Sequence, residues 1–268
     1  MEKLTKTGII FYCVALAGVG IHQFFYADFC LFLFPHWPNP FPGYAILVYV
    51  FNVLLIAACV AIIAGKKRRT ISLVLGGVLL LMLLLGQVPY EYIVIPYKKT
   101  HLGLWVLPLK ELALVGGAFC IAGASSDENA DQQNKPLVIR VLEKLIPFGG
   151  VFFSTTMILF GVSHFLYTPT VSAMVPNWLS WHDFWTYFAA VVLIAGGVAI
   201  VIRVWVRLAA ALLGLMIFIW FVFLHTPDAV TNPLIGQGNE ITAAFSALAF
   251  SGIGFVIAGS YQPKKYKQ

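Results

Sequence analysis

The chain has 268 residues, of which 60% are hydrophobic and only 10% charged, and its mean hydropathy is +0.88. Soluble domains carry about a quarter charged residues, so this composition excludes a protein whose whole surface faces water. The formal charge of +6 comes from basic residues that alternate with apolar runs along the chain, which is unlike the continuous basic patch of a nucleic-acid-binding protein.

Eight apolar stretches have the length that spans a bilayer, roughly 20 residues each. They are continuous, whereas the strands of a β-barrel alternate, so we predict an all-α, polytopic membrane protein with eight transmembrane helices. The first stretch is too long for the apolar core of a signal peptide and is predicted to remain as a helix. The predicted spans are Gly8–Phe34, Gly43–Gly65, Ile71–Val88, Leu104–Gly123, Leu145–Tyr167, Phe184–Ile202, Leu208–His225 and Ile241–Ser260.

The basic residues occupy every second connection and both ends of the chain. Only Lys98, Lys99 and Lys110 fall toward the other side. This asymmetry follows the positive-inside rule and predicts a bacterial inner membrane protein with both termini in the cytoplasm. The expected partner of these charges is the lipid bilayer, not nucleic acid. They are Lys3, Lys6, Lys66, Lys67, Arg68, Arg69, Lys135, Arg140, Lys144, Arg203, Arg207, Lys264, Lys265 and Lys267.

The four cysteines all fall within predicted helices, and no two of them form a Cys-x-x-Cys pair. We interpret them as small buried apolar residues. Cys30, near the outer end of the first span, is the one that an oxidising compartment could reach.

The polar segment Ser125–Lys144 divides the chain into halves, 1–124 and 145–268, that carry similar residues at similar spacing. Arg69 and Arg207 are 138 residues apart, as are Pro89 and Pro227, and His22 and His164 are 142 apart. Each half has an even number of predicted spans, so the copies share one orientation. We therefore predict two parallel four-helix bundle repeats joined by a cytoplasmic linker at 125–144.

The second half contains GVSHFLY at 161–167, MVPNW at 174–178 and NEITAAFSALAFSGIGFVIAG at 239–259. These motifs resemble the DoxX-like family of small four-helix membrane proteins. The first half has a weaker copy, with GVGIHQFFY at 18–26 but no Asn-Glu to match 239–240. The resemblance implies a membrane subunit of a quinone-linked redox system; distant relatives act as cargo receptors or chaperones.

Ionisable residues gather in the outer halves of the predicted spans, where such groups are expensive and often functional. We predict that His22, His164, His225 and Glu240 line a ligand site near the outer leaflet. The alternative is structural: the first two histidines would hydrogen-bond neighbouring helices, His225 would anchor a helix end, and Asn239 and Glu240 would cap the last helix.

Lys110 and Glu111 lie about 10 Å inside the fourth span, at a rise of about 1.5 Å per residue. Adjacent helical residues point in different directions, so the two cannot face one partner. Lys110 is expected to reach outward to the membrane surface. Glu111 then needs a partner inside the bundle and joins the candidate site.

These observations favour a membrane subunit of a redox-linked, quinone-associated complex that binds a lipophilic small molecule and contacts a redox partner protein. The alternatives are a small-molecule transporter or exporter, and a scaffold or chaperone for another membrane protein. No motif for a metal, a nucleophile or a haem attachment is present. The sequence therefore names neither catalytic residues nor a cofactor.

Overall fold

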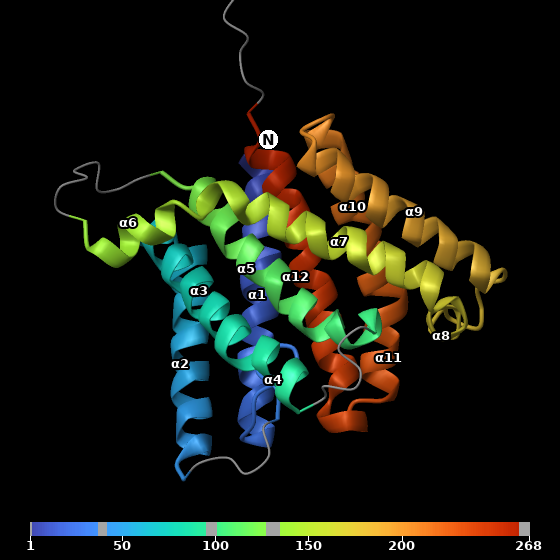
Figure 1. Cartoon of the computed structure of the whole chain (residues 1–268), viewed down its shortest axis with the longest axis horizontal. Coiled ribbons are helices and arrows are strands. Elements are labelled where there is room, and N and C mark those ends of the chain that lie inside the picture. The colour runs from blue at the N-terminus through green and yellow to red at the C-terminus, as the bar shows by residue number, and fades with distance from the viewer. Residues whose placement is uncertain (1, 37–41, 95–100, 127–134, 263–268) are drawn as a thin grey trace, which may run out of the picture.

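The computed structural model describes residues 2–36, 42–94, 101–126 and 135–262, and these form helices joined by short connections, with no strand among them. Figure 1 shows the arrangement. The long helices are α1 (Glu2–Tyr26), α2 (Tyr44–Ile63), α3 (Arg68–Met82), α5 (Val106–Gly123), α7 (Gly149–Leu166), α9 (His182–Val201), α10 (Val206–Trp220) and α12 (Asn239–Ser260). The short elements are η1 (Leu83–Gln87), α4 (Val88–Ile93), η3 (Leu102–Trp105), α6 (Leu137–Glu143), η5 (Ile146–Phe148), α8 (Thr168–Ser172), η6 (Phe221–His225), α11 (Thr226–Thr231) and η7 (Ile235–Gln237).

Within this described part of the chain, eight helical stretches are long and apolar enough to cross a membrane. The all-α class, the eight spans and the multi-pass membrane character are thus confirmed. The bounds of the first span were wrong, because its helix ends at Tyr26 and not at Phe34. Ala27 adopts a positive φ of 52°, which turns the chain away from the helix axis.

Two of the spans, Arg68–Ile93 and Val206–Thr231, contain a turn of π-helix. The N–H of Val88 donates to the carbonyl of Leu83, and that of Thr226 to the carbonyl of Phe221, five residues back in both cases. A proline follows each of these donors, and proline lacks the N–H that a regular helix needs. The wider turn accommodates the proline, and both helices continue as α4 and α11.

The same kinds of helix pairs occur in both halves of the chain. In the first half α1 packs on α2, α2 on α3 and α3 on α5; in the second, α7 packs on α9, α9 on α10 and α10 on α12. The halves meet along two main seams, α1 with α12 and α5 with α7, and α5 also contacts α12. In Figure 1, α1 and α12 lie side by side at the centre of the molecule.

Glycines allow very close approach of the helices at both seams. A Cβ atom added at Gly252 would lie 2.6 Å from the carbonyl oxygen of Gly8, across the α1–α12 seam. A Cβ at Gly116 would lie 2.6 Å from the carbonyl oxygen of Gly149, across the α5–α7 seam. Backbones this close require small residues, and in a membrane such contacts supply van der Waals packing between helices.

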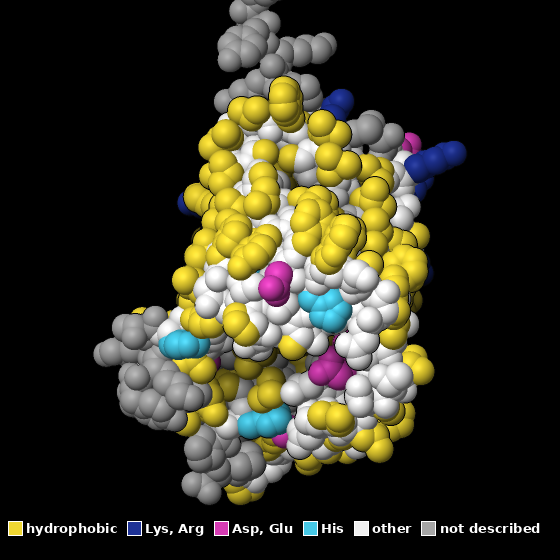
Figure 2. All heavy atoms as spheres, turned by 90° about the vertical axis from the view of Figure 1, so that its right-hand side faces the viewer, with side chains coloured by type: hydrophobic (Ala, Val, Ile, Leu, Met, Phe, Trp, Pro, Cys, Tyr) yellow, Lys and Arg dark blue, Asp and Glu magenta, His cyan; other side chains and the backbone are white. Residues whose placement is uncertain are grey.

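Polar groups are segregated along the molecule. In the face shown in Figure 2, Lys and Arg side chains lie in one half and His side chains in the other. At the basic end, Glu143 of α6 accepts from Arg69 Nε at 3.2 Å and from Lys135 Nζ at 2.9 Å, which fixes α6 against α3. Lys98, Lys99, Lys264, Lys265 and Lys267, and residues 127–134 of the linker, lie outside the described residues.

The segment 27–36 folds back from the end of α1 into the first half of the bundle. Phe32 and Leu33 are buried there, and the ring of Phe34 lies against Gly86 of η1. Gln87 donates from Nε2 to the carbonyl of Leu31. Cys30 belongs to this segment and not to a helix, and it is buried. The expectation that an outer compartment could reach its thiol was therefore wrong.

Candidate functional site

A cavity of about 720 Å³ lies among α5, α7, α9, α12 and the kinked α10–η6 helix. Its walls are mostly apolar and aromatic, and they include Met157, Phe160, Trp185, Trp220 and Phe250. Ligand pockets for drug-sized molecules occupy roughly 300–1,000 Å³ and combine apolar walls with a few polar groups. In size and lining this cavity matches a site for a lipophilic small molecule.

Three hydroxyl groups on the cavity walls are already engaged. Ser163, Thr186 and Ser246 each donate to the backbone carbonyl four residues earlier in their own helix, at 2.8–3.0 Å. Such a bond uses the single hydroxyl proton and leaves only acceptor lone pairs. These residues can accept a hydrogen bond from a ligand, but they are not free donors.

His225 and Lys110 on the walls have side-chain nitrogens without a hydrogen-bond partner among the described residues. The Nδ1 atom of His225 is buried and has no hydrogen-bond partner among the described residues. Lys110 lines the same cavity and forms no ion pair or hydrogen bond within the described parts of the chain. Lys110 and Glu240 do not form an ion pair. The expectation that Lys110 simply reaches the membrane surface missed its position on the cavity wall.

His164 also lines the cavity, from the last turn of α7. Its Nδ1 atom lies 2.7 Å from the carbonyl oxygen of Phe160, so Nδ1 carries the proton in that hydrogen bond and Nε2 is left as an acceptor in the neutral ring. At the edge of the cavity, the rings of Tyr167 and His101 stack with their centroids 4.9 Å apart. The Tyr167 hydroxyl also accepts from the N–H of Gly103 at 3.3 Å, which ties the end of α7 to η3.

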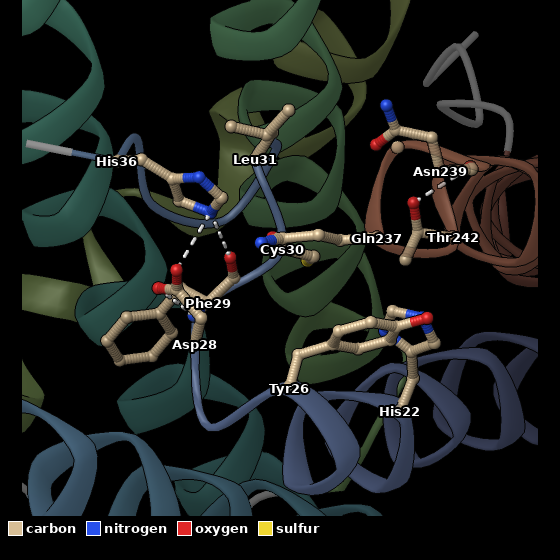
Figure 3. A pocket seen from close by; sticks show the side chains of 11 residues that line it. His22, Tyr26, Asp28, Phe29, Cys30, Leu31, His36, Gln237, Asn239 and Thr242 are labelled. Atoms are coloured by element: carbon tan, nitrogen blue, oxygen red, sulfur yellow. Dashed lines mark hydrogen bonds and ion pairs between the residues drawn. The ribbon is translucent and has the colours of Figure 1, made fainter. Parts of the chain in front are cut away.

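His22 lies in a different and much smaller pocket, shown in Figure 3. This pocket has a volume of about 10 Å³, which is room for about one water molecule. The His22 ring packs on Tyr26 at a centroid distance of 4.9 Å and touches Gly238. Beside it, His36 Nε2 lies 3.4 Å from Asp28 Oδ2 and 2.9 Å from the carbonyl oxygen of Phe29. This arrangement stabilises segment 27–36 and offers no space for a lipophilic ligand.

Glu240 and Glu111 line neither of these two pockets. Glu240 lies in the first turn of α12, as expected, but the N-cap of that helix is Gly238 and not Asn239. Glu111 is completely buried, and both of its carboxyl oxygens lack a partner among the described residues. The partner that we expected for Glu111 is therefore not found there.

The structure thus brings together His164 and His225 and adds Lys110, whereas His22, Glu111 and Glu240 lie elsewhere. Sequence reasoning missed Lys110 as a cavity residue because it assigned a lysine near a helix end to the membrane surface. The aromatic walls were missed as well, since tryptophans near span ends are typical of interface belts.

No family model, curated protein or solved structure matches this chain.

Proposed function

We propose that this membrane protein binds a lipophilic small molecule in the cavity among α5, α7, α9, α10–η6 and α12. The observation that carries the proposal is the volume of about 720 Å³ behind mainly apolar walls with a few polar groups. Walls of this extent offer a lipophilic molecule van der Waals contacts from several helices at once.

The narrower form of the proposal is a quinone-associated membrane subunit of a redox-linked complex. It rests on the DoxX-like resemblance of the sequence alone. A visible and ultraviolet spectrum of the purified protein, followed by organic extraction, tests it directly, because a quinone gives a characteristic redox-dependent absorption.

A transporter whose halves rock about a shared site receives less support, since the cavity is lined by α5 and the second half and not by both halves equally. No feature of the described residues favours a scaffold or chaperone.

We also propose that the two halves are parallel repeats of one four-helix unit. The matching helix pairs, the two glycine seams and the π-turns at Leu83–Gln87 and Phe221–His225 support this. So do two arginines: Arg69 donates to the carbonyl of Ala122 at 3.2 Å, and Arg207 donates to that of Tyr261 at 3.0 Å.

The repeat register explains why His22 and His164 lie in different surroundings. Gly20 packs against Ile56, and Gly161 packs against Ile194 in the same way, which relates α1 to α7 by 141 residues. With that offset His164 corresponds to Gln23, not to His22. Gln23 accepts from the N–H of Cys30 at 3.3 Å, so in the first half this position holds the folded-back segment.

The proposed orientation, with both termini in the cytoplasm, predicts which positions an impermeant maleimide reaches from outside intact cells. Single cysteines at the exposed residues Thr170 and Asn232 should react, whereas cysteines at Lys67 and Lys144 should react only after permeabilisation. The unchanged chain, with three of its four cysteines buried, gives the background. Labelling of the Lys67 position from outside would reverse the orientation.

Filling the cavity should displace its occupant. Ala189→Trp places an indole on the α9 wall, and we expect the lipophilic material that co-purifies with the protein to fall roughly tenfold, a change of about 1.4 kcal/mol in binding. Val191→Trp is the matched control, because Val191 on the same helix is 56% exposed and faces away from the bundle. Mass spectrometry of organic extracts measures the occupant. Equal amounts of extracted lipophilic material from both variants would show that the cavity is not the binding site.

A further inference from the structure

We propose that the molecule bound in this cavity is an anionic amphipath, with a carboxylate or phosphate head held by Lys110 and His225 and an apolar body among the aromatic walls. This inference deepens the proposed function and rests on it. The two side chains come from α5 and η6, on different walls of one cavity, and both line it.

The argument begins with the charge of Lys110. The lysine lies in the first half of a membrane-spanning helix, and its side chain faces a cavity lined mainly by apolar groups. An ammonium group in such surroundings is unfavourable unless an opposite charge or several acceptors compensate it. Among the described residues, no side chain or backbone group accepts a hydrogen bond from Lys110, and no acidic side chain forms an ion pair with it.

A neutral ligand does not meet this requirement as well as an anion does. A carbonyl oxygen gives the ammonium one hydrogen bond but leaves the charge uncompensated. A carboxylate or phosphate supplies a charge-assisted hydrogen bond, which is roughly twice as strong as a neutral one. Its second oxygen can accept from His225 Nδ1, which is buried and lacks a partner. One anionic head therefore satisfies both side chains.

The first half of the molecule shows how the equivalent space is completed without a ligand. Gln87 is related to His225 by the 138-residue offset, and its side-chain amide donates to the carbonyl of Leu31. Phe34 of the same segment lies against Gly86, and Gly86 corresponds to Leu224 on the cavity wall. The chain itself thus provides an acceptor and apolar groups there. In the second half an external molecule with an acceptor head and an apolar body has the corresponding role.

The test compares two probes with the same hydrocarbon chain, oleic acid and oleyl alcohol, titrated into the full-length protein in phosphatidylcholine nanodiscs. Quenching of the emission of Trp185 and Trp220, which line the cavity, reports occupancy when brominated forms of both probes are used. We expect the carboxylate to bind about 10-fold to 100-fold more tightly than the alcohol, as loss of a hydrogen bond to a charged group implies. Oleyl phosphate distinguishes a phosphate-bearing lipid from a fatty acid as the preferred source of the head.

Variants assign the preference to the lysine. Lys110→Gln should abolish the preference for the anion while the alcohol still binds, and Lys110→Arg should keep it. Lys3→Gln removes an exposed lysine at the start of α1 and controls for a change in net charge. Equal binding of acid and alcohol to the unchanged protein, or a preference that survives Lys110→Gln, would overturn the anionic head. Ala189→Trp separates this proposal from the proposed function. If Ala189→Trp abolishes binding of both probes while Lys110→Gln changes the affinity for neither probe, the cavity binds lipophilic molecules but does not select an anion.

Discussion

Gly149→Ala is expected to lower the free energy of unfolding by about 1–3 kcal/mol, as overpacking of a tight interface does. The new Cβ atom would lie 2.8 Å from the carbonyl oxygen of Gly116 and 2.9 Å from the amide nitrogen of Cys120. Both neighbours are backbone atoms of a long helix, so neither can move aside alone. The α5–α7 seam must open to relieve the clash.

The adjacent residue provides the control. A Cβ at Gly150 meets nothing closer than Ile200, at 3.8 Å. Gly150→Ala should therefore leave stability unchanged or raise it by up to about 1 kcal/mol through helix propensity. Unfolding of both variants by denaturant in one detergent compares them directly. Equal stability of the two would mean that the seam is not closely packed.

Glu111→Met is expected to raise the free energy of unfolding by about 1–3 kcal/mol, because it replaces a buried polar group that lacks partners with an apolar chain of similar length. The Glu111 side chain is fully buried, and neither carboxyl oxygen is hydrogen-bonded within the described residues. Folding must therefore strip water from this carboxyl group without replacing the lost hydrogen bonds.

Glu111→Gln tests whether the gain in stability comes from removing the buried polar group and not from a change of side-chain shape. Glutamine keeps the shape and two buried polar atoms, so we expect little gain from it. The measurement is thermal and denaturant unfolding of the three proteins in one detergent. A loss of stability in Glu111→Met would show that the carboxyl group has a partner after all, and would return Glu111 to the list of functional candidates.

The spans were predictable from the sequence because the bilayer imposes a length and a composition on every helix that crosses it. The end of α1 was not predictable, since residues 29–34 are apolar whether they extend a helix or fold back on it. The sequence FYADFCLFLF contains no proline before Pro35, and only the positive φ at Ala27 reveals the turn.

The candidate site was predicted only in part, and the reason is geometric. His164 and His225 were singled out as costly polar residues inside spans, and both line the large cavity. His22 met the same criterion, but sequence separation does not specify whether two helices share a cavity. Lys110 faces the cavity because α5 packs against α7, a tertiary contact that no local pattern encodes.

The pairing of α1 with α12 has a consequence for the order of synthesis. Helix α1 is synthesised well before its partner α12, because roughly 210 residues separate Tyr26 from Asn239. At about 5–20 residues per second, α1 waits on the order of 10–40 seconds in the membrane before its main partner arrives. During that interval the Gly8 face of α1 is open to lipid or to other nascent helices. A ribosome that stalls before α12 leaves the seam unclosed, so a truncated chain displays a surface that quality control in the membrane can distinguish from the finished protein.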